Sequence, residues 1–197
     1  MRKILLFAAL ALTCGESALA NENLIKIPLT RQATDYTCGA AAMQSMLGYY
    51  GEDLNESELA KILKTNDQEG TDYNEIVALA KEKGYSVNVF KDMTLKDLKK
   101  QLDKKTPVLC LIQAWATKKT DYKTDWNDGH YVVAIGYDKN KIYFMDPSTL
   151  GNYTYIDQKG FLKRWHDKNS KETLNHFGLT IKKKKTAYKQ EEIKFMP

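Results

Sequence analysis

The chain of 197 residues contains few cysteines and few histidines, three of each. Cys14 lies near the start, so only Cys38 and Cys110 belong to the body of the protein. This number excludes a small domain held together by many disulfides. The length after residue 20 is sufficient for one domain with a core of its own.

The sequence also lacks an apolar run long enough to cross a membrane, which takes about 20 residues. The run Ile4–Leu12 follows two basic residues and precedes small residues that end at Ala20. This pattern predicts a secretory signal peptide, residues 1–20, with a buried first helix as the alternative. Cys14 would be removed with the signal, because Thr13 precedes it where a lipid-anchor site usually has glycine or alanine.

No charge of one sign dominates. The formal net charge is +5, and removal of the predicted signal leaves 28 basic and 24 acidic residues, a net charge of +4. The basic run Lys182–Lys185 has no base-stacking aromatic motif beside it, so nucleic acid is not a predicted partner. We interpret the run as a solvated strand end or tail, with contact to an anionic surface as the alternative. Repeats and low-complexity linkers are also lacking, so residues 21–185 are predicted to form one domain and residues 186–197 a loosely held tail.

The order of periodic segments predicts an α+β domain. Helical spacing and cap residues predict helices over residues 38–50, 54–65, 72–84 and 94–104, with a strand at 85–90 between the last two. Runs typical of strands cover residues 107–115, 129–138, 141–147, 152–157 and 174–182, with a short helix at 160–167. We therefore expect an N-terminal helical layer packed on a C-terminal antiparallel sheet.

Cys38 stands at the start of the first predicted helix and is followed by Gly39 and three alanines. A helix N-terminus and a nearby imidazolium both favour the thiolate, which is the nucleophilic form of cysteine. The small residues would leave the sulfur open to a substrate backbone. Two alternatives stay open, a core cysteine and a disulfide with Cys110. Cys110 lies in the apolar run "PVLCLIQAW", where we interpret it as a small buried hydrophobe.

Among the histidines, His130 is the candidate base, because it opens the apolar run "YVVAIGY" directly after Asp128-Gly129. His166 and His176 lie in polar or amphipathic surroundings and are predicted to be structural. The turn near residues 138–141 would bring Asp146 close to His130 across a hairpin. Such a carboxylate can orient the imidazole and stabilise the imidazolium. A structural role for His130, and a turn-initiating role for Asp146 before Pro147, are the alternatives.

Gln32 precedes Cys38 by six positions. Acyl transfer needs hydrogen-bond donors for the developing oxyanion, and a side-chain amide beside the backbone N–H of Cys38 would supply one. Gln32 alone predicts no function. It becomes a candidate site residue only as a member of the ordered set of Gln32, Cys38, His130 and Asp146.

This ordered set, "QATDYTCGAAAMQSMLGYYG", then "GHYVVAIGYD", then "DPS", resembles the bacteriocin-processing peptidases that remove double-glycine leaders, a family of papain-like cysteine peptidases. The resemblance covers residues 27–151. It implies that Cys38 is the nucleophile, His130 the general base, Asp146 the orienting acid and Gln32 the oxyanion donor. It also implies a preference for a small residue such as glycine before the cut.

The sequence departs from the best-known members of that family, whose peptidase is the cytosolic front of a transporter. It shows no later membrane helices and no phosphate-binding loop, and it carries a predicted signal. We therefore expect an exported, periplasmic or secreted cysteine peptidase without metal or organic cofactor, acting on leaders, loops or tails of secreted or surface proteins. Stable membrane insertion after signal removal is not expected, and secretion or surface-assembly proteins are candidate partners. The alternatives are a cell-wall peptide amidase or acyl transferase on the same scaffold, and a non-catalytic peptide-binding chaperone or docking module.

Overall fold

A computed structural model describes residues 24–117, 119–184, 187–189, 192–193 and 195–196. The predicted signal peptide, including Cys14, lies outside these residues. Across the described ranges, no helix combines the length and the apolar character needed to span a membrane.

Six antiparallel strands form the main sheet, in the order β1-β8-β2-β3-β4-β5. The strands are β1 (Ser86–Phe90), β2 (Val108–Gln113), β3 (Gly129–Tyr137), β4 (Lys141–Met145), β5 (Thr154–Asp157) and β8 (Gly178–Lys182). A second sheet pairs β6 (His166–Lys168) with β7 (Thr173–Asn175). The central strands β2 and β3 are buried along almost their whole length, because helices cover both faces of the sheet. Their near-continuous apolar sequence follows from that burial.

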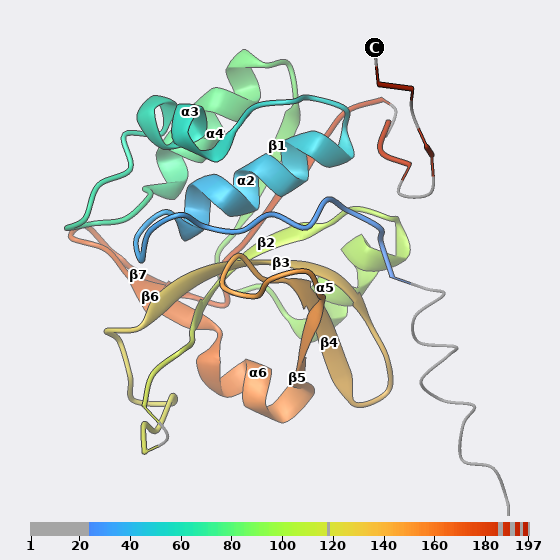
Figure 1. Ribbon diagram of the computed structural model, residues 1–197. Coiled ribbons are helices and arrows are strands. Elements are labelled where there is room, and N and C mark those ends of the chain that lie inside the picture. Colours follow the sequence, from blue (N-terminus) through green and yellow to red (C-terminus); the bar gives the residue numbers. More distant parts are fainter. Residues whose placement is uncertain (1–23, 118, 185–186, 190–191, 194, 197) are drawn as a thin grey trace, which may run out of the picture.

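The helices are α2 (Cys38–Tyr49), α3 (Glu56–Ile62), α4 (Tyr73–Glu82), α5 (Leu95–Asp103) and α6 (Gln158–Arg164). In Figure 1, α2, α3 and α4 lie on one side of the sheet and α6 lies on the other. α2 packs on β3 and against α3, and α6 packs on β2, β4 and β5. Ten of the twelve residues of α2 are buried, so this helix forms the centre of the core. The expected helical layer on an antiparallel sheet is confirmed.

The predicted caps of the second and third helices and the predicted stop of the third agree with the structure, whereas the second helix ends at Ile62, before the predicted Thr65. Asn55 caps α3 through a reciprocal pair of hydrogen bonds with Glu58, and Asp72 accepts a hydrogen bond from the Asn74 amide at the start of α4. Gly84 follows α4 with a φ of 77°, a conformation that favours glycine. Local sequence chemistry therefore determines these ends.

Two predicted elements near the end of the chain are wrong in their extent. The helix expected over residues 160–167 ends at Arg164, and the strand expected over 174–182 is divided between β7 and β8. The break falls at His176, whose φ is 48° and whose amide donates to the Trp165 carbonyl at 2.8 Å. The Trp165 indole in turn donates to the Phe177 carbonyl at 2.8 Å. This long-range pairing, which has no local sequence signal, overrides the strand pattern.

The predicted tail, residues 186–197, is only partly covered by the described residues. Its Ala187 packs against Gly51, and the amides of Ala187 and Tyr188 donate to the Tyr49 carbonyl at 3.2 and 3.3 Å. The start of the tail therefore contacts the C-terminal end of α2.

Candidate active site

Cys38 is the first residue of α2, and its side chain is 7% exposed. Thr37 occupies the cap position, but its hydroxyl accepts a hydrogen bond from the Thr34 amide at 3.1 Å, so the described side chains leave α2 uncapped. The first turn of α2 also contains no acidic residue. The partial positive charge of the first-turn amides therefore acts on the sulfur without competition from a side chain.

His130 and Asp146 come together across the hairpin formed by β3 and β4. Val133 lies opposite Met145, and the register shifts between Ala134 and Gly136. The Nε2 atom of His130 lies 2.8 Å from Oδ1 of Asp146, and both side chains are buried. The predicted proximity of this pair is therefore confirmed.

The surroundings of His130 favour the imidazolium. Burial by itself lowers the pKa of His130, but the hydrogen bonds with Asp146 and Cys38, together with their negative charges, outweigh it and raise the pKa to about 9. Because Nε2 is bonded to Asp146, Nδ1 is the ring nitrogen left for Cys38. The imidazole thus lies between a carboxylate and a thiol, which is the arrangement of a catalytic triad.

Asp146 is itself held by the turn that follows it. Its Oδ1 accepts a hydrogen bond from the Ser148 amide at 2.9 Å, and its Oδ2 accepts one from the Thr149 hydroxyl at 3.3 Å. The Thr149 amide also donates to the Asp146 carbonyl at 3.0 Å. Asp146 therefore initiates the turn and is also hydrogen-bonded to His130, so the two interpretations from sequence are compatible.

Gln32 joins the same network from the extended segment that precedes α2. The backbone N–H of Gln32 donates to the Pro147 carbonyl at 3.0 Å. The side-chain Oε1 of Gln32 accepts a hydrogen bond from the Ser148 hydroxyl at 3.1 Å. Its side-chain NH2 donates to the Thr34 carbonyl at 2.8 Å. An amide nitrogen carries two hydrogens, so a second one is left for a substrate oxygen.

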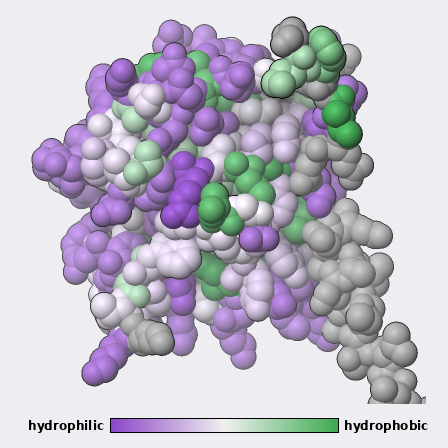
Figure 2. Space-filling view, in the orientation of Figure 1, coloured by the Kyte–Doolittle hydropathy of each residue, from purple (hydrophilic) through white to green (hydrophobic). Residues whose placement is uncertain are grey.

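A cavity of about 560 Å³ opens beside Cys38. Gly70, Thr71, Gly129 and Tyr131 are among the residues that line it. The Tyr131 hydroxyl donates to the Thr71 carbonyl at 3.0 Å, which links β3 to the segment before α4. In Figure 2, the surface over α3 and α4 is mostly hydrophilic, and apolar groups gather nearer the centre, where the helical layer meets the sheet.

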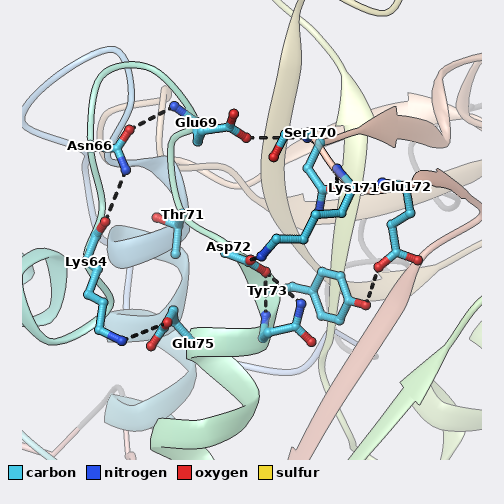
Figure 3. A network of polar contacts seen from close by, with 12 residues as sticks. Lys64, Asn66, Glu69, Thr71, Asp72, Tyr73, Glu75, Ser170, Lys171 and Glu172 are labelled. Atoms are coloured by element: carbon cyan, nitrogen blue, oxygen red, sulfur yellow. Dashed lines mark hydrogen bonds and ion pairs between the residues drawn. The ribbon is translucent and has the colours of Figure 1, made fainter.

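Polar contacts tie the loop before α4 to the turn between β6 and β7, as Figure 3 shows. The Tyr73 hydroxyl donates to Glu172 at 2.7 Å, and Lys171 forms an ion pair with Asp72 at 3.3 Å. The Ser170 amide donates to Glu69 at 3.4 Å. These contacts fix one wall of the cavity relative to the other.

Sequence reasoning missed the residues that shape this cavity, chiefly Thr71, Tyr131 and Asp167. The close packing explains two glycines: a Cβ at Gly39 would lie 2.6 Å from Cβ of Thr71, and one at Gly129 would lie 2.5 Å from Oδ2 of Asp167. Gly129 was visible beside the candidate histidine, but nothing in the sequence indicates which distant side chain it accommodates.

The remaining cysteine and histidines have structural surroundings. Cys110 is fully buried in β2, and both Cys38 and Cys110 are free thiols, so the alternative disulfide is not formed. His166 is buried, with Nε2 at 2.7 Å from the Asp125 carbonyl, and His176 stacks on Trp165. Among the described residues, no group of three or more metal-binding side chains is placed to hold an ion.

The fold is that of the papain-like cysteine peptidases, because solved peptidase domains superimpose on most of the chain. These include a C39-like peptidase from Bacillus anthracis, with a TM-score of 0.64, 18% identity and coverage of 83% of this chain and 98% of that one. The peptidase domain of Streptococcus ComA, an ABC transporter, gives a TM-score of 0.59 at 22% identity, covering 80% and 97%. A double glycine motif protease from an AMS/PCAT transporter, solved in complex with the leader peptide, gives 0.57 at 18% identity, covering 80% and 92%.

Sequence comparison defines the family within this class. Residues 24–174 match the Peptidase_C39 like family, and the chain belongs to it. The transport/processing ATP-binding protein ComA of Streptococcus pneumoniae is 30% identical over 135 residues, which are 68% of this chain and 17% of that protein. The lactococcin transport/processing ATP-binding protein LcnC-like of Lactococcus lactis is 28% identical over 137 residues, which are 69% of this chain and 17% of that protein. The chain therefore spans less than a fifth of the length of these curated relatives.

Proposed function

We propose that this chain is an exported cysteine peptidase that cuts an extended leader, loop or tail of a secreted or surface protein. The observation that carries the proposal is the position of His130 between Asp146 and Cys38, with Cys38 at an uncapped helix start. Export is inferred from the signal peptide pattern of residues 1–20.

The geometry supports a two-stage hydrolysis. The Cys38 sulfur attacks the peptide carbonyl carbon, and the oxygen takes the negative charge beside the first-turn amides of α2 and the Gln32 amide. His130 gives its proton to the leaving amine as the C–N bond breaks, which leaves a thioester on Cys38. A water molecule, deprotonated by His130, then attacks the thioester and releases the acid and the free thiol.

The preferred substrate has a small residue, such as glycine, before the cut. Two facts support this proposal: Gly39 and Thr71 pack closely next to the nucleophile, and one structural neighbour is a double glycine motif protease solved with a leader peptide. The leader peptide belongs to that neighbour, so for this chain we propose as substrate class an extended segment with a small residue before the cut.

Mass spectrometry of peptide termini tests the proposal. Secreted and surface proteins are incubated with the wild-type chain, with Cys38→Ala and with Cys110→Ala as a matched control for thiol removal. We expect new termini with the wild type and with Cys110→Ala, and none with Cys38→Ala. Identical termini in all three samples contradict the proposal. Release of cell-wall peptides alone supports the amidase alternative, and binding without cleavage supports the docking module.

A further inference from the structure

Asp167 places a carboxylate in the wall of the cavity that opens at Cys38. It lies in β6 opposite Leu174, and its Oδ2 comes so close to Gly129 that any Cβ there would collide with it. Gly129 is exposed, lines the same cavity and directly precedes His130. The absence of a side chain at Gly129 therefore leaves Asp167 open to a group bound next to the catalytic residues.

The hydrogen bonds of Asp167 fix it without neutralising it. Its Oδ1 accepts a hydrogen bond from the Gln113 amide at 3.0 Å, and the Lys168 backbone amide donates to it as well. Gln113 is itself fully buried, and its Oε1 accepts a hydrogen bond from the Asp128 backbone amide at 2.9 Å. Both donors are neutral amides, so they orient the Asp167 carboxylate without cancelling its negative charge.

Two of the three lysines that line the cavity are already paired, and the third, Lys168, follows Asp167 in the chain; Asp167 itself is in no ion pair with a described residue. Lys171 is bonded to Asp72 and Lys64 to Glu75 at 2.9 Å, as Figure 3 shows. Burial raises the pKa of Asp167 to about 6, more than the nearby His166 and Lys168 charges lower it. A carboxylate that is buried in a cleft at this cost, without an ion pair to a described residue, is a candidate binding group.

Asp167 and Cys38 line the same cavity. Burial raises the pKa of Tyr131, and the charges of Cys38 and Asp167 both raise it further. Tyr131 lines the same cavity as both groups, so one peptide bound there can contact both.

We propose that Asp167 is a specificity-determining residue that binds a cationic side chain, lysine or arginine, of the peptide substrate close to the scissile bond. The inference rests on the proposed peptidase function for the identity of the ligand. A hydrogen bond to a charged partner contributes about 1.5–3 kcal/mol, or about 10-fold to 100-fold in affinity. The alternative is a purely structural role in holding Gln113, which an asparagine at this position would preserve.

A binding measurement tests Asp167 independently of catalysis. Fluorescently labelled, extended peptides carry one lysine, moved along the peptide, and each is matched to a peptide with norleucine at that position. Fluorescence polarisation is measured with the full chain carrying Cys38→Ala. At one position the lysine peptide should bind about 10-fold more tightly than its norleucine match. Adding Asp167→Asn should abolish that preference, and adding Asp53→Asn, the same charge change at an exposed site, should leave it intact.

Cleavage of the same peptides by the chain with Cys38 intact separates the two proposals. Lysine-dependent binding without any cleavage supports Asp167 as the cation-binding residue and contradicts the peptidase function. Cleavage without a lysine preference contradicts the Asp167 proposal alone. A lysine preference that survives Asp167→Asn also overturns it, because the cation would then be bound elsewhere.

Discussion

The N-terminus of α2 is uncapped, whereas the N-termini of α3 and α5 are capped by side chains. Asn55 and Thr94 form capping boxes with Glu58 and Asp97, which supply both hydrogen bonds and negative charge. α2 has neither, and Cys38 stands there instead. Because a missing cap costs about 1 kcal/mol, the difference indicates that α2 gives up local stability and keeps a positive potential for the sulfur.

The largest effect should follow removal of the reactive pair. We expect Cys38→Ala and His130→Ala each to reduce peptide turnover by about 10⁴-fold or more, and the double variant to be no worse than either, because the two residues act as a unit. Single-turnover kinetics on a peptide identified by mass spectrometry measures this. Additive losses in the double variant would show that the residues act separately.

Replacement of Asp146 should change the pH dependence of turnover. The hydrogen bond and charge of Asp146 help to raise the pKa of His130 to about 9, so activity that needs the imidazolium should fall as the pH rises through about 9. Asp146→Asn removes the charge and lowers that pKa, so the alkaline limb should move to lower pH. The loss at the optimum should be smaller than for Cys38→Ala, because an amide can still orient the ring. An unchanged alkaline limb would exclude His130 as its source.

The same pKa shift predicts part of the stability profile. The pKa of His130 is higher in the folded chain than the ordinary value of 6.5, so its stabilising contribution is full below pH 6.5 and disappears as the pH rises through about 9. Melting curves across this range should show the loss in wild type and a smaller loss in Asp146→Asn.

Gln32→Ala should reduce turnover by roughly 100-fold, the effect expected for an oxyanion donor. Alkylation of Cys38 by iodoacetamide should continue at the wild-type rate, because the thiolate does not depend on this amide. Gln101→Ala, in α5 and remote from the site, is the matched control. Full activity of Gln32→Ala with an unchanged melting curve would show that Gln32 lies near the nucleophile without acting as an oxyanion donor.

The smallest effect comes from making the two kinds of helix start alike. Thr37→Asp places a capping carboxylate at α2, and the added negative charge should slow alkylation of Cys38 about fivefold, the equivalent of ~1 kcal/mol. Thr94→Ala removes the cap of α5, which should cost about 1 kcal/mol of stability and leave the alkylation rate unchanged. Faster alkylation in Thr37→Asp would contradict the role assigned to the uncapped end.

The sequence predicted the parts of the fold that depend on local chemistry. Caps at Asn55 and Asp72, the turn at residues 138–141 and the apolar runs of β2 and β3 are all visible in short segments. The break at His176 is not visible in any short segment, because it depends on hydrogen bonds between the Trp165 and Phe177 regions. Patterns within a short stretch of sequence do not predict pairings between separate segments.

The candidate site divides in the same way. His130 and Asp146 could be paired in advance because one hairpin joins them, and Gln32 lies just before the helix of Cys38. Thr71 and Asp167 come from separate parts of the chain and meet only in the folded cavity. Ser148 was also missed, although its hydroxyl and amide link Gln32 to Asp146. The candidate reacting groups were therefore predictable, and the groups that shape and connect the site were not.

The most direct test of the account is the alkylation of Cys38 in the folded wild-type chain, with Cys110 as the internal reference. Burial strongly raises the pKa of Cys110, so this thiol should stay unmodified across the pH series. We expect iodoacetamide to modify Cys38 at pH 6 much faster than it modifies glutathione, and His130→Ala to remove that advantage. Modification of Cys38 no faster than glutathione, or a Cys38–Cys110 disulfide in the purified protein, would contradict the assignment of Cys38 as an activated nucleophile.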